Sequence, residues 1–461
     1  SLTGIRLGLC WEMICCNTPT GGVTLRGDVK GAYLTSKLSG PKTYLRLAGL
    51  KNLPDTLRRA AEGVSDPCVL LESSVYGLER GDTDWGNKSR GVLRELGAKL
   101  IRDVGEDSIW LWPGEKEEEP ACVVVVYSDD FQLSGPRMPA TRRFRILDER
   151  LGFSPVLSFV MREIVGLERY NTLDARGNKV MVIHQTAYAR FVVQGFIDQH
   201  NKGRPLRKVA TPGFAHEAKG KQNADGIAEE DFEVPAYIPS LGAFVFEVGG
   251  KLLWLARGSR IDLAAAVRKL LQRATRWTRM EDYLLWRVMC YLHTYPNLGL
   301  EYKVDVKEIP GMVVAQRSDA DLAGDTFDAK STTGFHTGLR GARNSWMVLD
   351  WASRKQGGTA RNTPDAELTG IDEATHTSGL VQQEIFENLL RRPVRLIAET
   401  DNETAVAVVA KGYSRRLCYL RRTQRISISG LHDVYHGIGD AEEMEPSDAR
   451  TLNRLYHLSG D

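Results

Sequence analysis

The sequence predicts a mixed α/β (α+β) protein of several domains, because strand and helix patterns both occur along its 461 residues. Four consecutive valines at positions 123–126 are typical of a strand that is buried on both faces. Apolar side chains recur at helical spacing over residues 261–277. Residues 331–356 alternate in the manner of strands separated by turns. A chain of this length exceeds one ordinary core, so we expect about two to four domains.

Composition and charge exclude several classes of protein. The apolar and charged fractions, 42% and 26%, are those of a soluble globular protein, and no apolar run approaches the roughly 18 residues of a membrane helix. The seven cysteines are odd in number and lack CxxC spacing, which argues against a disulfide framework or a zinc site and favours a reducing compartment. Ser1 is not an initiator Met, which is consistent with a piece of a longer polyprotein or gene.

A pair of acidic residues follows the valine strand directly. Asp129 and Asp130 come after Tyr127 and Ser128, and a second apolar stretch begins at Phe131. The pattern predicts a tight β-hairpin with two adjacent carboxylates at its tip. Such carboxylates repel each other and lose solvation beside a buried strand, which favours a divalent cation nearby. An ordinary Asp-Asp surface turn is the alternative.

The N-terminal part predicts a further acidic position. Residues 1–13 have the pattern of an amphipathic helix, and a β-branched strand that begins at Val23 ends at Asp28. Tyr33 follows five positions later, a spacing that lets its ring fold back over the strand end. An Asp at the end of a strand is common, so Asp28 is a candidate site residue only in combination with Asp129 and Asp130.

The middle of the chain predicts helices and a polar linker. Residues 142–151 and 283–293 have helical patterns, and residues 180–196 predict a strand followed by a helix. Residues 201–233 are rich in Gly, Lys, Asp and Glu, as linkers and loops are.

Basic residues are clustered at positions 141–150, 257–279 and 411–425, the last with interleaved tyrosines. Positive charge beside aromatic rings suits a nucleic-acid backbone. A solvated helix face is the alternative for each cluster.

The C-terminal part contains a second acidic set. One strand pattern ends at Asp319 and another ends at Asp401. Thr363 and Pro364 are typical of the N-cap and the first position of a helix, and that helix carries Glu367. Two strand-end aspartates and one helical glutamate can converge on a metal pair.

Three motifs resemble the polymerase blocks of copia-type (Pseudoviridae-like) retrotransposon reverse transcriptases. GDVKGAYL, SSVYGLERGDTDW and VVVVYSDDFQLSG stand in the order of the family's DVKTAFLNG, LYGLKQAPRxW and LYVDDMLITG. The resemblance implies that Asp28, Asp129 and Asp130 are catalytic metal ligands of a polymerase palm. It also implies that Tyr33 gates the 2′ position of the nucleotide sugar.

Some positions depart from the family pattern. In the second block, Arg80 and Asp82 replace the family's Gln and Pro. Because this block supports the nucleotide and the template in the family, Arg80 is an expected substrate-binding residue. LSFVMREI resembles the FLGxEI block near the primer terminus, with Met161 in place of Gly, and Phe159 is the expected substrate contact there. The family's basic fingers segment lies upstream of Asp28, and the chain begins too late to contain it.

The C-terminal acids resemble those of the ribonuclease H domain of the same elements. The family's DADWAG, WxSxKQ, EAELxA and DN blocks are matched in order, which implies that Asp319, Glu367 and Asp401 are catalytic metal ligands. RTQRISISGLHD stands where the family has RTKHIDIxYH, so a fourth acid is replaced by Ser427. Asp433 nearby is the alternative for that position.

The resemblance also implies a domain order. The expected parts are a palm with an antiparallel sheet and incomplete fingers at 1–140, the end of the palm with a thumb-like region and linker at 141–225, a helical connection at 226–310, and a ribonuclease H-like mixed-sheet domain at 311–461.

The implied function is that of an RNA-directed DNA polymerase with ribonuclease H, using two Mg²⁺ ions per active site, or Mn²⁺ as an alternative. The implied partners are RNA template, DNA primer, RNA/DNA hybrid and dNTPs, without a membrane. The implied location is a cytoplasmic virus-like particle with a nuclear phase. The rival interpretation is a degenerate or repurposed copy that binds nucleic acid without catalysis. The altered positions favour the rival, and the six retained acids favour the enzyme. A P-loop phosphotransferase is a third class, but no GxxxxGK[ST] loop is present.

Overall fold

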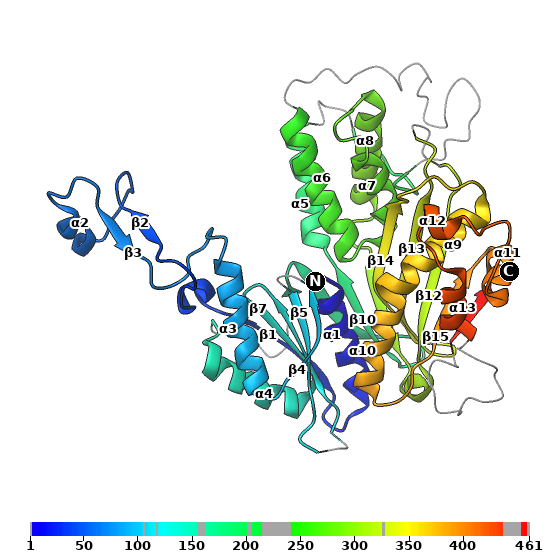
Figure 1. Cartoon of the computed structure of the whole chain (residues 1–461), viewed down its shortest axis with the longest axis horizontal. Helices are drawn as coiled ribbons and strands as arrows, with labels where there is room; N and C mark the ends of the chain where they lie inside the picture. The colour runs from blue at the N-terminus through cyan, green and yellow to red at the C-terminus, as the bar shows by residue number, and fades with distance from the viewer. Residues whose placement is uncertain are drawn as a thin grey trace. The chain divides into compact units, whose positions relative to one another are not determined.

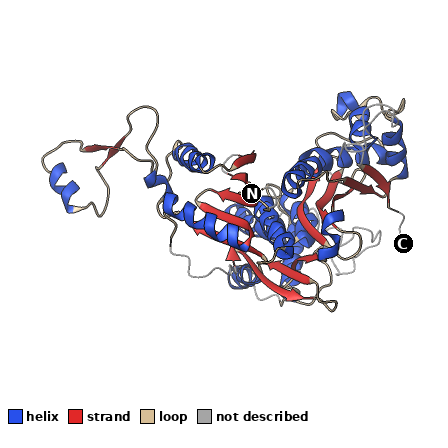
Figure 2. Ribbon diagram, turned by 90° about the horizontal axis from the view of Figure 1, so that it is seen from below, coloured by secondary structure: helices blue, strands red, loops and turns tan. Residues whose placement is uncertain are grey.

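The computed structural model describes residues 2–104, 107–116, 119–154, 163–200, 205–213, 241–324, 328–436 and 453–458. It divides into two compact units, essentially residues 3–160 (unit 1) and 161–461 (unit 2). Both units combine helices with a β-sheet, which confirms the mixed α/β prediction (Figures 1 and 2). Within the described residues, none of the helices has the length and apolar character needed to cross a bilayer.

The elements of unit 1 are helices packed on an antiparallel sheet, with a small separate two-stranded sheet formed by β2 and β3. In chain order they are α1 (Leu2–Ile14), β1 (Gly22–Asp28), the 3₁₀ helix η2 (Ala32–Thr35), β2 (Tyr44–Arg46), α2 (Asp55–Ala61), β3 (Cys68–Leu70), α3 (Gly81–Glu95), β4 (Lys99–Val104), β5 (Asp107–Trp112), β6 (Cys122–Tyr127), β7 (Asp130–Pro136) and α4 (Arg137–Leu151).

The valine strand β6 lies at the centre of this unit. Among the described residues, five strands form the main sheet in the order β1-β7-β6-β5-β4, all antiparallel. Val124 and Val126 face a core shared with α3 and α4. Val125 faces the opposite side, where α1 packs so closely that a Cβ on Gly4 would lie 3.0 Å from it. Helices cover both faces of the strand, as its uninterrupted apolar run predicts.

Helix α1 differs from the expected amphipathic helix. All residues from Gly4 to Ile14 are buried, including Arg6 and Glu12. Trp11 Nε1 donates a hydrogen bond to the carbonyl oxygen of Ala121 at 2.8 Å, which fixes the helix on the sheet. The amphipathic prediction is wrong because the helix is covered on all sides.

The elements of unit 2 are strands β8 (Glu163–Ile164), β9 (Leu167–Leu173), β10 (Lys179–His184), β11 (Gly299–Val304), β12 (Val313–Ala320), β13 (Thr332–Arg340), β14 (Trp346–Lys355), β15 (Leu396–Thr400) and β16 (Arg454–His457), and helices α5 (Thr186–Gln199), α6 (Leu241–Gly258), α7 (Ala264–Leu271), α8 (Arg279–Thr294), α9 (Thr363–Ala374), α10 (Leu380–Leu390), α11 (Glu403–Lys411), α12 (Leu420–Thr423) and α13 (Ile428–His436).

The sheet of unit 2 is mixed. Its described strands follow the order β16-β15-β12-β13-β14-β11-β10-β9-β8, with β15 parallel to both β12 and β16 and every other pair antiparallel. Helix α9 packs on β12 and β13, where Gly370 lies against Ala320 and Thr333. The buried side chain of Gln316 on β12 donates to Thr375 Oγ1 at 3.2 Å at the end of this helix.

Helices α5 to α8 share a second core in unit 2. The single helix expected over residues 261–277 is wrong, because α7 covers only its middle. The buried guanidinium of Arg260 contacts Asp262 at 2.8 Å and fixes a separate turn before α7. After α7, the backbone nitrogen of Thr278 donates to Glu281 at 2.7 Å and begins the next helix. Most of the expected 201–233 linker lies outside the described residues.

Candidate metal centre

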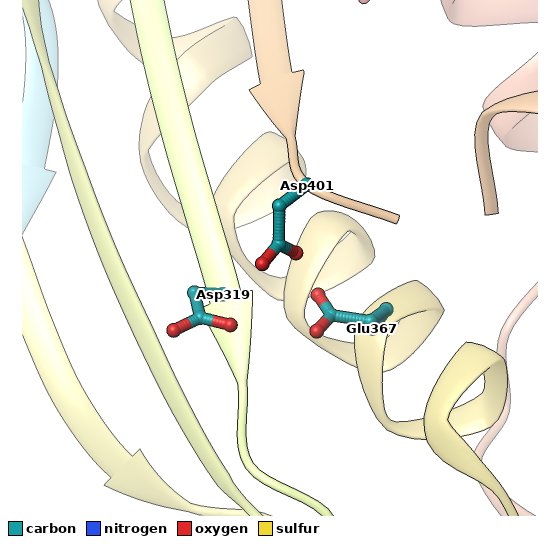
Figure 3. A group of neighbouring side chains, drawn as sticks. All are labelled: Asp319, Glu367 and Asp401. Carbon is teal, nitrogen blue, oxygen red and sulfur yellow. The ribbon is translucent and has the colours of Figure 1, made fainter. Parts of the chain in front are cut away.

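Three carboxylates of unit 2 converge (Figure 3). Asp319 lies near the end of β12, Asp401 directly follows β15, and Glu367 lies on α9. Their ligand atoms all lie within 4.8 Å of one another. Strands β12 and β15 are parallel neighbours, so their carboxyl ends meet at one edge of the sheet, where ligand sites commonly form. Figure 3 shows the carboxylates turned toward a common space.

Glu367 is the buried member of this group. Only 2% of the residue is exposed, whereas Asp319 and Asp401 are exposed. The backbone nitrogen of Ala320 donates to Oε1 at 3.3 Å, and the Thr400 hydroxyl donates to Oε2 at 3.5 Å. Burial, together with the charges of Asp319 and Asp401, raises the pKa of Glu367 to about 7 despite the hydrogen bond from Ala320.

The donor atoms of the group fit a hard divalent cation. All are carboxylate oxygens, which Mg²⁺ and Mn²⁺ prefer, and the group includes no His or Cys. A cation there would relieve the repulsion that raises the pKa of Glu367. Sequence analysis missed the two groups that hold Glu367, namely Ala320 N and Thr400 Oγ1, since each is identified only by the packing of α9 on the strands.

The start of α9 differs by one residue from the prediction. The N-cap is Asn362, whose side-chain oxygen accepts a hydrogen bond from the backbone nitrogen of Asp365 at 3.0 Å. Thr363 is already the first helical residue and Pro364 the second. Asn362 has an extended backbone, so its side-chain oxygen can accept a hydrogen bond from an N–H of the first helical turn. Thr363 is already helical and therefore does not act as the N-cap.

The position expected for a fourth acid has a structural role. Ser427 Oγ accepts a hydrogen bond from the backbone nitrogen of Gly430 at 3.1 Å, just before α13. Asp433 lies on α13. Among the described residues, the group of converging ligands consists of Asp319, Glu367 and Asp401.

The acids of unit 1 are arranged differently. Tyr127 pairs with Asp130, so Ser128 and Asp129 form the turn of the predicted hairpin. Asp28 stands opposite Asp130 at the end of β1, and Val29 N donates to the carbonyl oxygen of Asp129 at 3.1 Å. These acids do not form a cluster of metal-ligand atoms comparable with that of unit 2 in the part of the chain that the structure describes.

Asp130 is held by a cation of the protein itself. Its Oδ1 accepts from Arg26 Nε at 2.7 Å, and Arg26 Nη2 lies at 2.7 Å from the same oxygen. Burial raises the pKa of Asp130 while Arg26 opposes the shift. Asp28 accepts a long hydrogen bond, 3.5 Å, from the Ser154 hydroxyl.

Tyr33 lies beside the hairpin turn. Its hydroxyl contacts the carboxylate of Asp82 and lies 3.4 Å from Ser128 Oγ, and its ring centroid lies 4.5 Å from that of Tyr76. A cavity of about 280 Å³ adjoins these groups, and Trp85 is part of its lining. Trp85 Nε1 also donates to the carbonyl oxygen of Ser128 at 2.8 Å, which fixes the turn.

The other two expected substrate contacts lie elsewhere. Arg80 donates to the carbonyl oxygens of Ser39 at 2.6 Å and Pro41 at 3.3 Å, so it ties the start of α3 to the segment before β2. Phe159 and Met161 lie outside the described residues.

The basic segment 411–425 lies against the start of α9. The Tyr419 hydroxyl donates to Asp365 Oδ2 at 3.0 Å, and the guanidinium of Arg361 lies 4.7 Å from the centre of the Tyr419 ring. Gln424 Nε2 donates to the carbonyl oxygen of Thr359 at 3.5 Å. The segment is thereby fastened to the helix that carries Glu367. Its exposed arginines are Arg415, Arg416, Arg421, Arg422 and Arg425.

Basic residues of the other two clusters form ion pairs within the fold. Arg142 contacts Glu115 at 2.6 Å, and Arg273 contacts Glu281 at 3.0 Å. These pairs reduce the net positive charge that the two clusters present to solvent.

No protein-family model matches the chain. It is 33% identical over 127 residues to the secreted RxLR effector protein 161 of Plasmopara viticola, a match that covers 27% of this chain and 82% of that protein. It is 23% identical over 348 residues to the retrovirus-related Pol polyprotein from transposon RE2 of Arabidopsis thaliana, covering 75% of this chain. The corresponding RE1 polyprotein is 32% identical over 122 residues, 26% of this chain. The chain spans only 20% and 8% of these two polyproteins.

Proposed function

The chain belongs to the family of the Plasmopara protein and is related to retrotransposon Pol polyproteins. We propose that unit 2 contains a ribonuclease H domain. Its substrate would be the RNA strand of an RNA/DNA hybrid. The observation that carries the proposal is the convergence of Asp319, Glu367 and Asp401 at the carboxyl ends of two parallel strands. The matched C-terminal motifs support the same assignment.

The acidic group would hold Mg²⁺, with Mn²⁺ as the alternative. When bound, the metal supplies an activated water and neutralises charge on the scissile phosphate. Asp319 and Asp401 are the exposed ligands and so the ones a substrate can approach. Ala320 N and Thr400 Oγ1 orient the buried Glu367. The exposed arginines of segment 411–425 would bind the phosphates of the hybrid close to this group.

Unit 1 is proposed as the palm of an RNA-directed DNA polymerase that binds RNA template, DNA primer and dNTPs. The three polymerase motifs support this, as does the close approach of Asp28 to the turn that carries Asp129. The boundaries 1–140, 141–225, 226–310 and 311–461 remain the proposed division into palm, thumb-like region, connection and nuclease. A cytoplasmic particle with a nuclear phase remains a family-based prediction.

The rival proposal is a degenerate or repurposed copy that binds nucleic acid without catalysis. The ion pair between Arg26 and Asp130 favours the binding-only copy for unit 1. The guanidinium of Arg26 neutralises the negative charge of Asp130, which is one of the expected metal ligands. The same argument does not apply to unit 2, because no ion pair to its three converging carboxylates is found among the residues that the structure describes. The two units are therefore tested separately.

The experiment is Mg²⁺-dependent cleavage of a labelled RNA/DNA hybrid beside primer extension on one preparation. Wild-type protein, Asp319→Asn and Asp129→Asn are compared. Asp319→Asn is expected to abolish cleavage and leave hybrid binding intact, whereas Asp129→Asn is expected to abolish extension alone. Hybrid binding without either activity would replace the catalytic proposal by the binding-only one. Cleavage that persists in Asp319→Asn would place the nuclease outside this chain's acidic group.

A further inference from the structure

A hollow in unit 2 has an unusual lining. Its volume is about 570 Å³, and the described residues around it include Arg317, Arg340, Arg343, Asn344 and Trp346. No acidic residue is among the described lining residues. Three guanidinium groups around one cavity of this size indicate a ligand with negative charge, and the volume lies in the range of small-molecule sites.

Two of the arginines are held in place by one buried carboxylate. Arg317 Nε contacts Glu399 Oε2 at 2.6 Å, and Arg340 Nη1 contacts Glu399 Oε1 at 2.7 Å. Burial alone would raise the pKa of Glu399, but the two arginines outweigh it and hold the pKa below its ordinary value. A guanidinium has five N–H donors, so sharing one carboxylate leaves Arg317 and Arg340 able to bind a further anion.

The third arginine, Arg343, lies on a turn whose backbone is held by hydrogen bonds to one carboxylate. The carboxylate of Glu308 accepts hydrogen bonds from the backbone nitrogens of Arg343 at 2.8 Å, Asn344 at 3.1 Å and Ser345 at 2.9 Å. Arg176 Nη1 donates to the side chain of Asn344 at 2.7 Å. The rim is therefore built by the fold before any ligand arrives, which lowers the entropy lost on binding.

The hollow also offers an aromatic surface. Trp346 is half-buried, and the edge-to-face contact of His336 with its ring, 5.6 Å between centroids, fixes its orientation. Val313 and Ile397 add apolar lining. A flat ring beside three guanidinium groups matches a ligand that combines a nucleobase with a phosphate, since bases stack on aromatic rings and phosphates bind arginine.

We propose that this hollow binds a nucleoside phosphate, with the base on Trp346 and the phosphate on Arg317, Arg340 and Arg343. The chemistry is shared by a free mononucleotide and by one unit of a single-stranded nucleic acid. The site goes beyond the proposed nuclease, because it needs neither the metal nor the acidic group. It is also near that group: Arg317 precedes Asp319 by two positions on β12, so both lie on the same face of the strand, about 7 Å apart along it.

The test is calorimetric titration of the full chain, with EDTA present, using AMP, inorganic phosphate and an oligodeoxyadenylate of about six nucleotides. Arg343→Glu is the main variant, because Arg343 is exposed and its backbone contacts are retained. It is expected to weaken AMP binding at least about tenfold by removing one charge-assisted contact and adding repulsion. Arg190→Glu, on α5, is the matched control and is expected to leave AMP affinity unchanged.

Substitution of the ring separates a nucleotide from a simple anion. Trp346→Leu is expected to weaken AMP about tenfold without changing the affinity for phosphate, and Trp346→Phe to restore most of the loss. Equal sensitivity of AMP and oligonucleotide to Arg343→Glu identifies a mononucleotide site. If the oligonucleotide binds the wild-type protein more tightly than AMP and loses more affinity in Arg343→Glu, the hollow is a site for a single strand.

Three results would overturn the proposal. The first is the absence of AMP and oligonucleotide binding, and the second is binding that Arg343→Glu does not change. The third is an acidic peptide that binds as tightly as AMP with no dependence on Trp346, which would indicate a protein ligand. Asp319→Asn is expected to leave AMP binding unchanged while it abolishes hybrid cleavage, so failure of this site and failure of the nuclease are distinguishable.

Discussion

Unit 1 and unit 2 each carry three acids that the sequence predicts to form a metal site, and their surroundings differ. In unit 2, Asp319 and Asp401 end parallel neighbouring strands, and a helix brings Glu367 between them. In unit 1, Asp129 lies in the turn of the β6–β7 hairpin and Asp28 pairs with Asp130 across β1 and β7, but among the described residues these acids form no comparable cluster of ligand atoms. The comparison teaches that topology, rather than the number of acids, decides whether carboxylates converge.

Electrostatic compensation also differs between the units. Arg26 neutralises Asp130 in unit 1, so part of the negative charge is balanced by the protein. In unit 2, burial and the charges of Asp319 and Asp401 raise the pKa of Glu367 to about 7, so proton uptake by Glu367 relieves part of the repulsion below that pH when no cation is bound. We therefore expect unit 2 to bind divalent metal more tightly than unit 1.

The largest expected effect is on metal binding by unit 2. Glu367→Gln removes one of three ligands and is expected to weaken Mn²⁺ binding and hybrid cleavage about a hundredfold, in the range for loss of one electrostatic contact at an active site. Asp28→Asn is expected to leave the tightest Mn²⁺ site unchanged. Calorimetry with Mn²⁺ measures both. If Asp28→Asn removed the tightest site instead, the comparison between the units would be reversed.

The second effect is the pH dependence that Glu367 imposes. Metal binding needs its deprotonated form, so Mn²⁺ affinity is expected to rise about tenfold per pH unit below about pH 7 and then level off. Without metal, the pKa is about 7 in the folded chain against an ordinary value of 4.5, so the folded state binds the extra proton between these values. The free energy of unfolding from this group therefore falls as pH rises from 4.5 to about 7.

Urea unfolding in EDTA at about pH 5 and about pH 7.5 measures this decline. Glu367→Gln does not titrate and provides the control, since its profile is expected to lack the contribution. A variant profile that matches the wild type would show that Glu367 has no raised pKa.

The third effect concerns the ion pair of unit 1. Arg26→Gln removes a cation beside the acids and is expected to strengthen Mn²⁺ binding by unit 1 about fivefold, a modest gain because the pair is partly exposed to solvent. Arg102→Gln, on β4 at the other edge of the sheet, is the control. Titrations on an Asp319→Asn background isolate unit 1. An unchanged affinity would show that carboxylate placement, rather than Arg26, limits this site.

The smallest effect concerns helix capping. Asn362 and Asn402 cap α9 and α11 beside the acidic group, whereas α3 and α4 of unit 1 have no side-chain cap. Asn362→Ala is expected to lower the free energy of unfolding by about 1 kcal/mol. Chemical denaturation measures the loss, and Asn388→Ala at an exposed position of α10 is the control. An equal loss in both variants would contradict a specific role for the cap.

Sequence patterns predicted the local elements well. The hairpin between β6 and β7 follows from an apolar run interrupted by a short polar turn, and the structure confirms it. The strands that end near Asp28, Asp319 and Asp401 were equally visible, because each depends on neighbouring residues only. The convergence of the acidic group in unit 2 was predicted from two strand-end aspartates and one helical glutamate, and the structure brings them together. The catalytic role implied by the family resemblance remains a prediction.

Long-range pairings were not predicted. Glu399 joins Arg317 and Arg340 only because β15, β12 and β13 are adjacent in the sheet, an order that no local pattern gives. The pairing of Arg26 with Asp130 likewise depends on the register of β1 with β7. The N-cap of α9 was misplaced by one residue because Asn362 and Thr363 are both good capping residues, and backbone conformation decides between them.

The pairing of β10 with β11 sets the order in which unit 2 can fold. Lys179 pairs with Val304 and His184 with Gly299, so the contact joins segments separated by α5 to α8. A chain emerging from the ribosome presents β9 and β10 long before β11 exists to pair with them. Until then β10 has an open edge, which is prone to non-native pairing. Closing so long a loop is slow, and β1 and β7 of unit 1 are separated by a segment of similar length, so each sheet stays incomplete until its late strand has been made.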